Sequence, residues 1–261
     1  VGSRFWPLSK KELPKQFLDI LGVGETLIQQ TFKRLSSICS VKNIFIVTNQ
    51  DYFTLCKEQL PKIDDNQILC EPVMRNTAPC IAYAAFKIHA LNNNAKLIVA
   101  PSDHLITDNE EFTKTIRHIF DAIENKEYLV TLGIHPTRPD TGYGYIQYDD
   151  SNLLVENNNI KKVKTFTEKP NKDLALQFLD SGDFLWNAGI FAFTSEAIIN
   201  SYKKYLRDIY DVFVSGEDIY NTKKEQEFIN RVFPTCKNIS IDYGILEKSD
   251  FVYVYPSSFG W

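Results

Sequence analysis

Two cations near the start of the chain could hold a polyanion. Arg4 and Lys15 lie eleven positions apart in the segment VGSRFWPLSKKELPKQFL, together with Gly2. Two prolines in the same segment disfavour a continuous helix, so we expect a loop. A loop with two fixed cations can bind a chain of phosphates through charge and through its backbone N–H groups. A solvated basic loop explains the same residues, and this segment alone leaves both interpretations open.

A carboxylate follows an apolar run near the middle of the chain. The run KLIVAP at 96–101 predicts a short buried strand, and Asp103 comes two residues after it. Ligands of open α/β sheets bind beyond the carboxyl ends of the strands, so this position suits chemistry. Asp103 could hold Mg²⁺, which prefers oxygen ligands and is often shared with substrate phosphates, or it could be a turn residue. His104 has no partner pattern, and we interpret it as structural or solvent-facing.

Polar residues also stand where a predicted strand gives way to a predicted helix, in CEPVMRNTAPCIA. The helix is expected over 76–92, with Asn76 or Thr77 as its cap and Pro79 in its first turn. The free N–H groups of a helix N-terminus favour anions, so Arg75 and the two capping residues could contact a base edge, a ribose or a phosphate. Capping explains Asn76 and Thr77, but it does not require the arginine before them.

Three segments of the second half carry residue types that suit a sugar. Two glycines flank Tyr143 in RPDTGYGYIQ, which indicates close approach of another group to the backbone, a bulge, or a tight turn into a strand. FTEKPN contains Glu168 and Lys169, and FLWNAGIF contains Asn187. Glutamate and asparagine hydrogen-bond sugar hydroxyls well, although surface charge and a turn explain the same residues.

The elements that must position these residues alternate along the first half. We expect helices over 26–38, 52–60, 76–92 and 110–124, and strands over 43–48, 67–72, 96–101 and 128–134. This order predicts an α/β fold with a doubly wound, mostly parallel mixed sheet, which is a Rossmann-like arrangement. The second half predicts strands near 141–148, 163–170 and 187–193 and helices over 172–181, 195–206 and 223–233.

Composition narrows the class of protein. The chain has 261 residues and a net charge of −4, which gives no support for a nucleic-acid binder. Five cysteines without a C-x-x-C pair favour reduced thiols over a zinc or redox motif. No apolar run approaches the roughly 20 residues that span a bilayer. GVGETL lacks the third glycine of a dinucleotide fingerprint, so we read it as a turn into a helix with Thr26 as a cap candidate.

Seven segments, taken in order, resemble the motifs of one family. They are GSRFWPLS…LPKQFL, EPVMRNTAPCIA, APSDH, GIHPTRPDTGYGYI, FTEKP, WNAGIFAF and IDYGILEKS. The series resembles bacterial mannose-1-phosphate guanylyltransferases, which are sugar-nucleotidyltransferases, and the resemblance covers nearly the whole chain. It implies transfer of GMP from GTP to mannose 1-phosphate, giving GDP-mannose and pyrophosphate, with Mg²⁺ as cofactor and a cytoplasmic location.

The resemblance also implies a role for each candidate residue. Its catalytic residues would be Arg4, Lys15 and Asp103, and Asp103 would hold Mg²⁺. Its nucleotide-binding residues would be Gly2, Ser3, Arg75, Asn76, Thr77, Pro79 and Ser102. Its sugar-binding residues would be Tyr143, Gly144, Glu168 and Asn187. We find no linker, so we expect one catalytic domain over 1–261, with a nucleotide-binding lobe about 1–135 and a sugar-binding lobe about 136–261.

Two other interpretations remain open at this point. The chain could be the catalytic part of a bifunctional phosphomannose isomerase and guanylyltransferase, or a regulatory subunit that binds a sugar nucleotide without turnover. The opening lacks an initiator Met and the family's further glycines, and SSFGW stops before the family's next Asp, so we expect both ends to be truncated. The resemblance allows a homodimer, and it implies neither a nucleic-acid partner nor a membrane partner.

Overall fold

The computed structural model describes residues 8–153 and 159–261. The chain forms two compact units. Of the described residues, the first contains those up to Glu71 together with Pro101–Thr113 and Phe259–Trp261, and the second contains Pro72–Ala100 and those within Lys114–Ser258. These bounds differ from a division near residue 135, because both units draw on segments that are far apart in the sequence.

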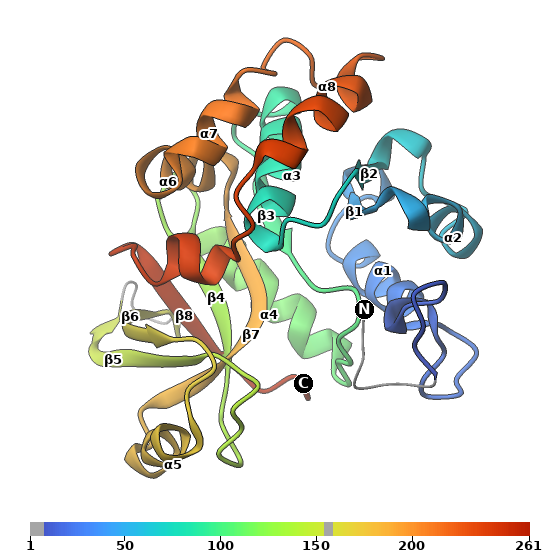
Figure 1. Ribbon diagram of the computed structural model, residues 1–261. Helices are drawn as coiled ribbons and strands as arrows, with labels where there is room; N and C mark the ends of the chain where they lie inside the picture. The colour runs from blue at the N-terminus through green and yellow to red at the C-terminus, as the bar shows by residue number, and fades with distance from the viewer. Residues whose placement is uncertain (1–7, 154–158) are drawn as a thin grey trace. The chain divides into compact units, whose positions relative to one another are not determined.

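The first unit has a small parallel pair of strands between helices. Its elements are α1 (Leu27–Ser36), β1 (Ile46–Asn49), α2 (Phe53–Gln59) and β2 (Ile68–Glu71), labelled in Figure 1. Thr26 is the N-cap of α1, and its backbone N–H donates to Gln29 Oε1 at 2.9 Å, as in a capping box. The buried core of this unit is apolar and consists of Phe17, Ile28, Ile44, Tyr52, Cys56, Leu60, Ile63, Ile68 and Cys70.

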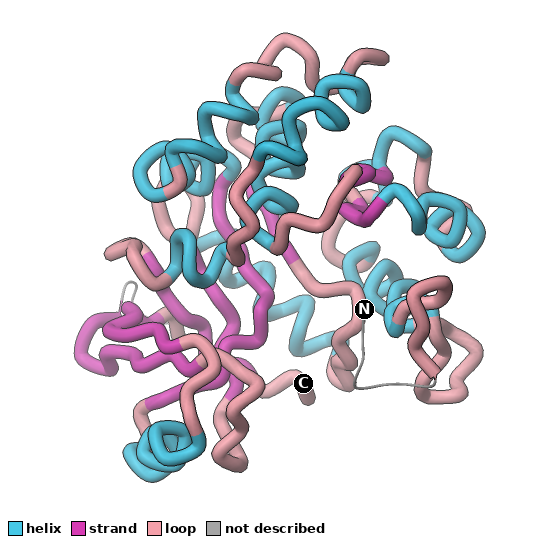
Figure 2. Tube along the Cα trace, viewed as in Figure 1, coloured by secondary structure: helices cyan, strands magenta, loops and turns pink. Residues whose placement is uncertain are grey.

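The second unit is built on a six-stranded mixed sheet, drawn in magenta in Figure 2. Its strands are β3 (Lys96–Val99), β4 (Leu129–Ile134), β5 (Tyr145–Leu153), β6 (Lys161–Thr167), β7 (Phe184–Thr194) and β8 (Val252–Ser257). The order is β3-β7-β4-β8-β6-β5, and the long strand β7 also pairs with β5. One end of β7 therefore lies against β5, while the other end lies against β3.

The second unit contains the helices α3 (Thr77–Leu91), α5 (Lys172–Ser181), α6 (Ser195–Tyr205), α7 (Arg207–Val214) and α8 (Glu225–Val232), while α4 spans Asn109–Ala122. Phe178 of α5 stacks on Phe184 of β7, and aromatic side chains also join α3 to α7. Figure 1 shows α3 beside α6 and α7, and the rings of Phe86 and Phe213 lie 6.0 Å apart between α3 and α7. Glu225 accepts hydrogen bonds from Lys87 and Tyr83 at 2.6 and 2.7 Å, so its buried charge is compensated.

The α/β class is confirmed, and the expected helices and strands are present within a few residues of their predicted ends. The directions of the strands differ from the expectation of a mostly parallel sheet. Among the described residues, β1–β2 and β4–β8 pair in parallel. The antiparallel pairs are β3–β7, β4–β7, β5–β6, β5–β7 and β6–β8. A strand buried on both faces is a continuous apolar run in either direction, so hydrophobicity does not report direction.

The sequence analysis did not predict every element of the second unit. It missed α7, strand β8, and a short π-helix over Asp242–Leu246. The π-helix lies within the segment IDYGILEKS, where the resemblance assigned no role to any residue. Single-turn π-helices are rare and occur frequently at functional sites, so this segment is relevant to the site described next.

Candidate functional site

Three predicted sugar-binding residues meet at the ends of three neighbouring strands. Gly144 precedes β5, Glu168 follows β6, and Asn187 lies in β7. Tyr145 pairs with Thr167 of β6 and with Trp186 of β7, and this register brings the adjoining residues together. The Asn187 backbone N–H donates to the Gly144 carbonyl at 2.8 Å. We call Gly144, Glu168 and Asn187 the sugar cluster.

Gly144 is a glycine because its neighbours occupy the space of a side chain. A Cβ at this position would lie 2.5 Å from Glu168 Oε2 and 3.4 Å from the Asn187 Cβ. The turn before it is held by Asp140, whose carboxylate accepts from the Gly142 N–H at 2.8 Å. The sequence left open a tight turn and a close approach to the backbone, and the structure contains both.

The side chain of Asn187 is held by three hydrogen bonds. Its Oδ1 accepts from Thr131 Oγ1 at 2.8 Å and from the Gly189 N–H at 3.1 Å. Its Nδ2 donates to Asp242 Oδ1 at 3.0 Å. Because a backbone N–H can only donate, the contact with Gly189 fixes which end of the amide is the oxygen.

Glu168 and Tyr143 complete this part of the unit. Glu168 forms an ion pair with Lys169, and only 9% of its side chain is exposed. The hydrogen bond that Lys169 Nζ donates to the Glu168 carboxylate raises the pKa of Lys169. The Tyr143 ring lies 5.1 Å from the Trp186 ring, so Tyr143 borders the same strand as Asn187.

Asp242 is a further candidate site residue, which reasoning from the sequence missed. It begins the π-helix, and its carboxylate contacts Asn187. Its pKa is raised to about 6, chiefly by burial and also by the negative charge of Glu168, while Lys169 and the Asn187 amide act in the opposite direction. Perturbed carboxyl groups of this kind cluster at functional sites. The segment IDYGILEKS was the available signal, since it stood out in the resemblance.

The predicted nucleoside contacts lie at the N-terminus of α3 in the same unit. Asn76 is the N-cap, with a φ of +67°, and its Oδ1 accepts from the Thr77 N–H at 2.9 Å. Thr77 Oγ1 accepts from the Ile241 N–H at 2.9 Å and so ties the helix start to the residue before Asp242. Arg75 donates to the Pro234 carbonyl at 2.6 Å. Pro79 is buried in the first turn.

The predicted cation and carboxylate lie together in the first unit. Lys15 opens a short turn at Lys15–Phe17, and its Nζ lies 3.1 Å from the Asp103 carbonyl and 3.7 Å from Asp103 Oδ2. The two side chains are 22% and 41% exposed. Ser102 stands in the same turn as Asp103. Gly2, Ser3 and Arg4 lie outside the described residues.

The indole ring of Trp261 contacts the side chain of His104. Trp261 Nε1 donates to His104 Nδ1 at 3.0 Å, and the two rings meet edge to face with centroids 5.4 Å apart. Burial lowers the pKa of His104, which favours its neutral form. These contacts agree with the interpretation of His104 as a structural residue.

Most of the chain matches one family, described as nucleotidyl transferase, over residues 1–232. The chain belongs to the nucleotidyl transferase family.

Solved structures support the same fold. A crystal structure of mannose-1-phosphate geranyltransferase from Thermus thermophilus matches with a TM-score of 0.86 at 28% identity, covering 99% of this chain and 71% of that one. A mannose-6-phosphate isomerase from Helicobacter pylori matches with a TM-score of 0.77 at 27% identity, covering 95% of this chain and 94% of that one.

A curated relative of this nucleotidyl transferase is similar along the whole chain. The mannose-1-phosphate guanylyltransferase RfbM of Salmonella typhimurium is 38% identical over 267 residues, which is 100% of this chain and 54% of that protein. The chain spans about half the length of the curated relatives it matches. Among the described residues, every helix is too short or too polar to cross a membrane.

The Asp103 carboxylate is of a type that suits a hard divalent cation in a nucleotidyl transferase. Within the described parts of the chain, no group of three or more His, Cys, Asp or Glu side chains could hold a metal. The Asp103 side chain, which ends in two carboxylate oxygens, is 41% exposed, and Lys15 is a nearby cation. Mg²⁺ commonly takes one or two carboxylates and completes its shell with water and substrate phosphates, so the Asp103 carboxylate fits Mg²⁺, while Lys15 would face the phosphates.

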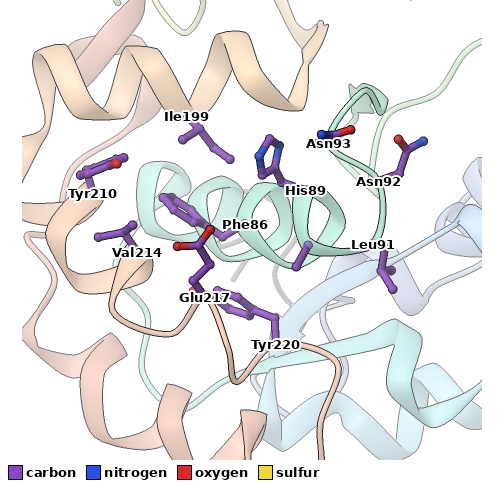
Figure 3. Close-up of a pocket in the computed structure, with 11 residues that line it drawn as sticks. Phe86, His89, Leu91, Asn92, Asn93, Ile199, Tyr210, Val214, Glu217 and Tyr220 are labelled. Atoms are coloured by element: carbon purple, nitrogen blue, oxygen red, sulfur yellow. The ribbon is translucent and has the colours of Figure 1, made fainter.

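A separate hollow of about 640 Å³ lies among the helices of the second unit. Figure 3 shows Phe86, Tyr210 and Tyr220 around it, with residues of α3, α6 and α7. It shares no residue with the sugar cluster. Its aromatic lining continues the packing between α3 and α7, and it has none of the predicted site residues.

Proposed function

We propose that this nucleotidyl transferase moves GMP from GTP to mannose 1-phosphate, giving GDP-mannose and pyrophosphate. The observation that carries the proposal is the sugar cluster, where a buried carboxylate and a fixed amide meet at a glycine. Such groups suit the hydroxyls of a sugar. The name of the Salmonella relative supports mannose 1-phosphate as the acceptor and a guanylyl group as the group transferred.

The reaction brings two anions together without a covalent enzyme intermediate. An oxygen of the sugar phosphate attacks the α-phosphorus of the nucleotide in line. The bond from that phosphorus to the oxygen that bridges the α- and β-phosphates breaks, and pyrophosphate leaves with the electron pair. Two like charges about 4 Å apart repel by roughly 4 kcal/mol at an effective dielectric near 20. Cations that are already in place offset this repulsion and the charge that develops on the leaving group.

Among the described residues, Lys15 would supply positive charge at the phosphates, and Asp103 would hold a metal cation there. The Lys15 ammonium would neutralise phosphate charge, as we also propose for Arg4. Its hydrogen bond to the Asp103 carbonyl keeps it near Asp103 even when the carboxylate has another ligand. Asp103 would hold Mg²⁺, which supplies charge neutralisation at the phosphates when it is bound. Arg75, Asn76, Thr77, Pro79 and Ser102 remain proposed nucleotide contacts, together with Gly2 and Ser3.

Pyrophosphate release by the complete native protein tests the proposal. Mg²⁺, mannose 1-phosphate and each nucleoside triphosphate are supplied in turn, with glucose 1-phosphate as the control sugar. We expect release with GTP and mannose 1-phosphate, and its loss when EDTA is added. Release with another pair would keep the chemistry and overturn the substrates. Binding of GDP-mannose without release from any pair would instead favour a regulatory subunit.

A second candidate comes from the Helicobacter pylori structure, which is named an isomerase and is covered over 94% of its length. Conversion of mannose 6-phosphate to fructose 6-phosphate, measured without nucleotide, tests it on the same preparation. Activity in both assays would support the bifunctional interpretation. We also propose a cytoplasmic location and a homodimer, which fractionation and light scattering of the native protein would test.

A further inference from the structure

Asp242 lies beside the sugar cluster, and its carboxylate has more acceptor positions than described donors. A carboxylate has about four acceptor positions. In the described chain, Asp242 receives the Asn187 amide at 3.0 Å and its own backbone N–H. Its remaining positions lie in a partly buried place, next to the negative charge of Glu168. A carboxylate that is short of donors when desolvated gains most from a ligand that brings them.

Asn187 can offer a ligand only a donor. Both acceptor positions of its Oδ1 are taken, by Thr131 and by Gly189. One hydrogen of its Nδ2 goes to Asp242, so the second hydrogen is the one left for a ligand. The contact with Asp242 therefore decides both the orientation of the amide and what it can bind.

The three side chains together make a hydroxyl-binding set. Glu168 and Asp242 accept hydrogen bonds, and Asn187 donates one. A sugar hydroxyl both donates and accepts, and neighbouring hydroxyls on one ring can satisfy two carboxylates at once. A phosphate would be repelled by the same pair of carboxylates, so the set discriminates the sugar ring from the phosphates.

We propose that Asp242 is a sugar-binding residue, which accepts a hydrogen bond from a ring hydroxyl of the sugar phosphate and orients Asn187 as a donor. The proposal rests on the proposed function, because it concerns the sugar of the same reaction. A hydrogen bond holds the start of the π-helix in place, because the Ile241 N–H donates to Thr77 Oγ1 at the N-terminus of α3.

The isosteric substitution Asp242→Asn separates this role from a structural one. The new amide oxygen still accepts from Asn187 Nδ2, so the internal hydrogen bond is kept while the charge and the spare acceptor capacity are lost. A purely structural role predicts no change specific to the sugar. The proposed role predicts weaker sugar binding at unchanged nucleotide binding.

The experiment is calorimetry with the complete native protein and its variants. The measured quantity is the ratio of the Kd for GDP to the Kd for GDP-mannose, which isolates the contribution of the sugar. We expect Asp242→Asn to lower this ratio by about 10- to 100-fold, the scale of a hydrogen bond to a charged group. The Kd for GDP should stay the same. Asp250→Asn removes an exposed carboxylate of the same stretch and serves as the matched control.

Deoxy analogues then identify the hydroxyl. Monodeoxy mannose 1-phosphates are compared with mannose 1-phosphate by kcat/KM in the wild type and in Asp242→Asn. For the analogue that lacks the contacted hydroxyl, the penalty seen in the wild type should disappear in the variant. An unchanged affinity ratio together with unchanged analogue penalties would overturn the proposal.

Failure of the proposed function gives a different result. If no pyrophosphate is released with mannose 1-phosphate, the substrate assignment fails, and the affinity ratio is measured with a panel of other sugar nucleotides. A ratio that falls in Asp242→Asn for the sugar nucleotide that binds would still support the role of Asp242. A ratio that does not fall for any of them would overturn it.

Discussion

The sugar cluster and the pair of Lys15 and Asp103 are organised in different ways. In the sugar cluster, the Asn187 amide has three hydrogen bonds at 2.8 to 3.1 Å, and the Glu168 side chain is 9% exposed. The Lys15 ammonium lies 3.7 Å from a carboxylate that is 41% exposed. The first set is preorganised before any ligand arrives, whereas the second is a looser pair of charges.

This difference matches the ligands that the two sets would bind. Hydroxyls are neutral, so their recognition depends on exact placement of donors and acceptors. Phosphates and Mg²⁺ carry charge, and charge attracts over longer distances and tolerates small changes in position. The four predictions below test the comparison, beginning with the largest expected effect.

Lys15→Ala should have the largest effect on turnover. Removal of one electrostatic donor from the phosphates should lower kcat by about two to four orders of magnitude. The affinity for the sugar should change little. The variant should melt close to the wild type, because Lys15 is not part of the apolar core of its unit. Lys10→Ala, which removes an exposed lysine of the same segment, is the control. Normal turnover in a folded Lys15→Ala protein would contradict the assigned role.

Asp103→Ala should also cripple turnover, by about 100- to 1,000-fold, because the carboxylate proposed to hold Mg²⁺ is lost. A titration of pyrophosphate release against Mg²⁺ concentration checks it. The wild type should saturate, and the variant should need more Mg²⁺ or fail to saturate. The same Mg²⁺ dependence in both proteins would show that Asp103 does not hold the ion.

Gly144→Ala should act on the sugar and spare the nucleotide. The added methyl group would lie 2.5 Å from Glu168 Oε2, so the carboxylate must move away from its place. Displacement of a binding group by about 1 Å can cost 100-fold, and we expect the KM for mannose 1-phosphate to rise on that scale. The KM for GTP, measured in the same preparation, is the internal control. Equal changes in both constants would argue against a preorganised sugar cluster.

Asp242→Asn should make the protein more stable at neutral pH, and among the four predictions this one concerns stability and not turnover or substrate affinity. The pKa of Asp242 is raised from 3.8 to about 6, so the folded protein binds this proton more tightly than the unfolded chain. Ionisation of Asp242 therefore lowers the free energy of unfolding. This loss is absent below about pH 4 and complete above about pH 6, where it reaches roughly 3 kcal/mol. Urea unfolding at pH 7.5 and at pH 4 measures it. We expect a gain in the variant at pH 7.5 that disappears at pH 4, and a loss at pH 7.5 would contradict this account.

Much of the local structure could be predicted from the sequence. Thr26 and Asn76 cap helices as expected, since capping depends on residues only a few positions apart. Gly144, Glu168 and Asn187 were also singled out, because their residue types and surroundings are informative even without a partner. Asp242 was not singled out, because no residue near it in the sequence shows that its carboxylate lies partly buried beside Glu168.

The sequence by itself determined which segments form helices and strands, which faces are apolar, and the resemblance that names the reaction. The tertiary structure decided that β5 pairs with both β6 and β7, which brings Gly144 to Glu168 and Asn187. It also placed Asp242 against Asn187, in a partly buried position that raises its pKa. Periodicity records whether a side chain is buried. Neighbours and pKa values depend on strand order, register and the charges that packing brings together.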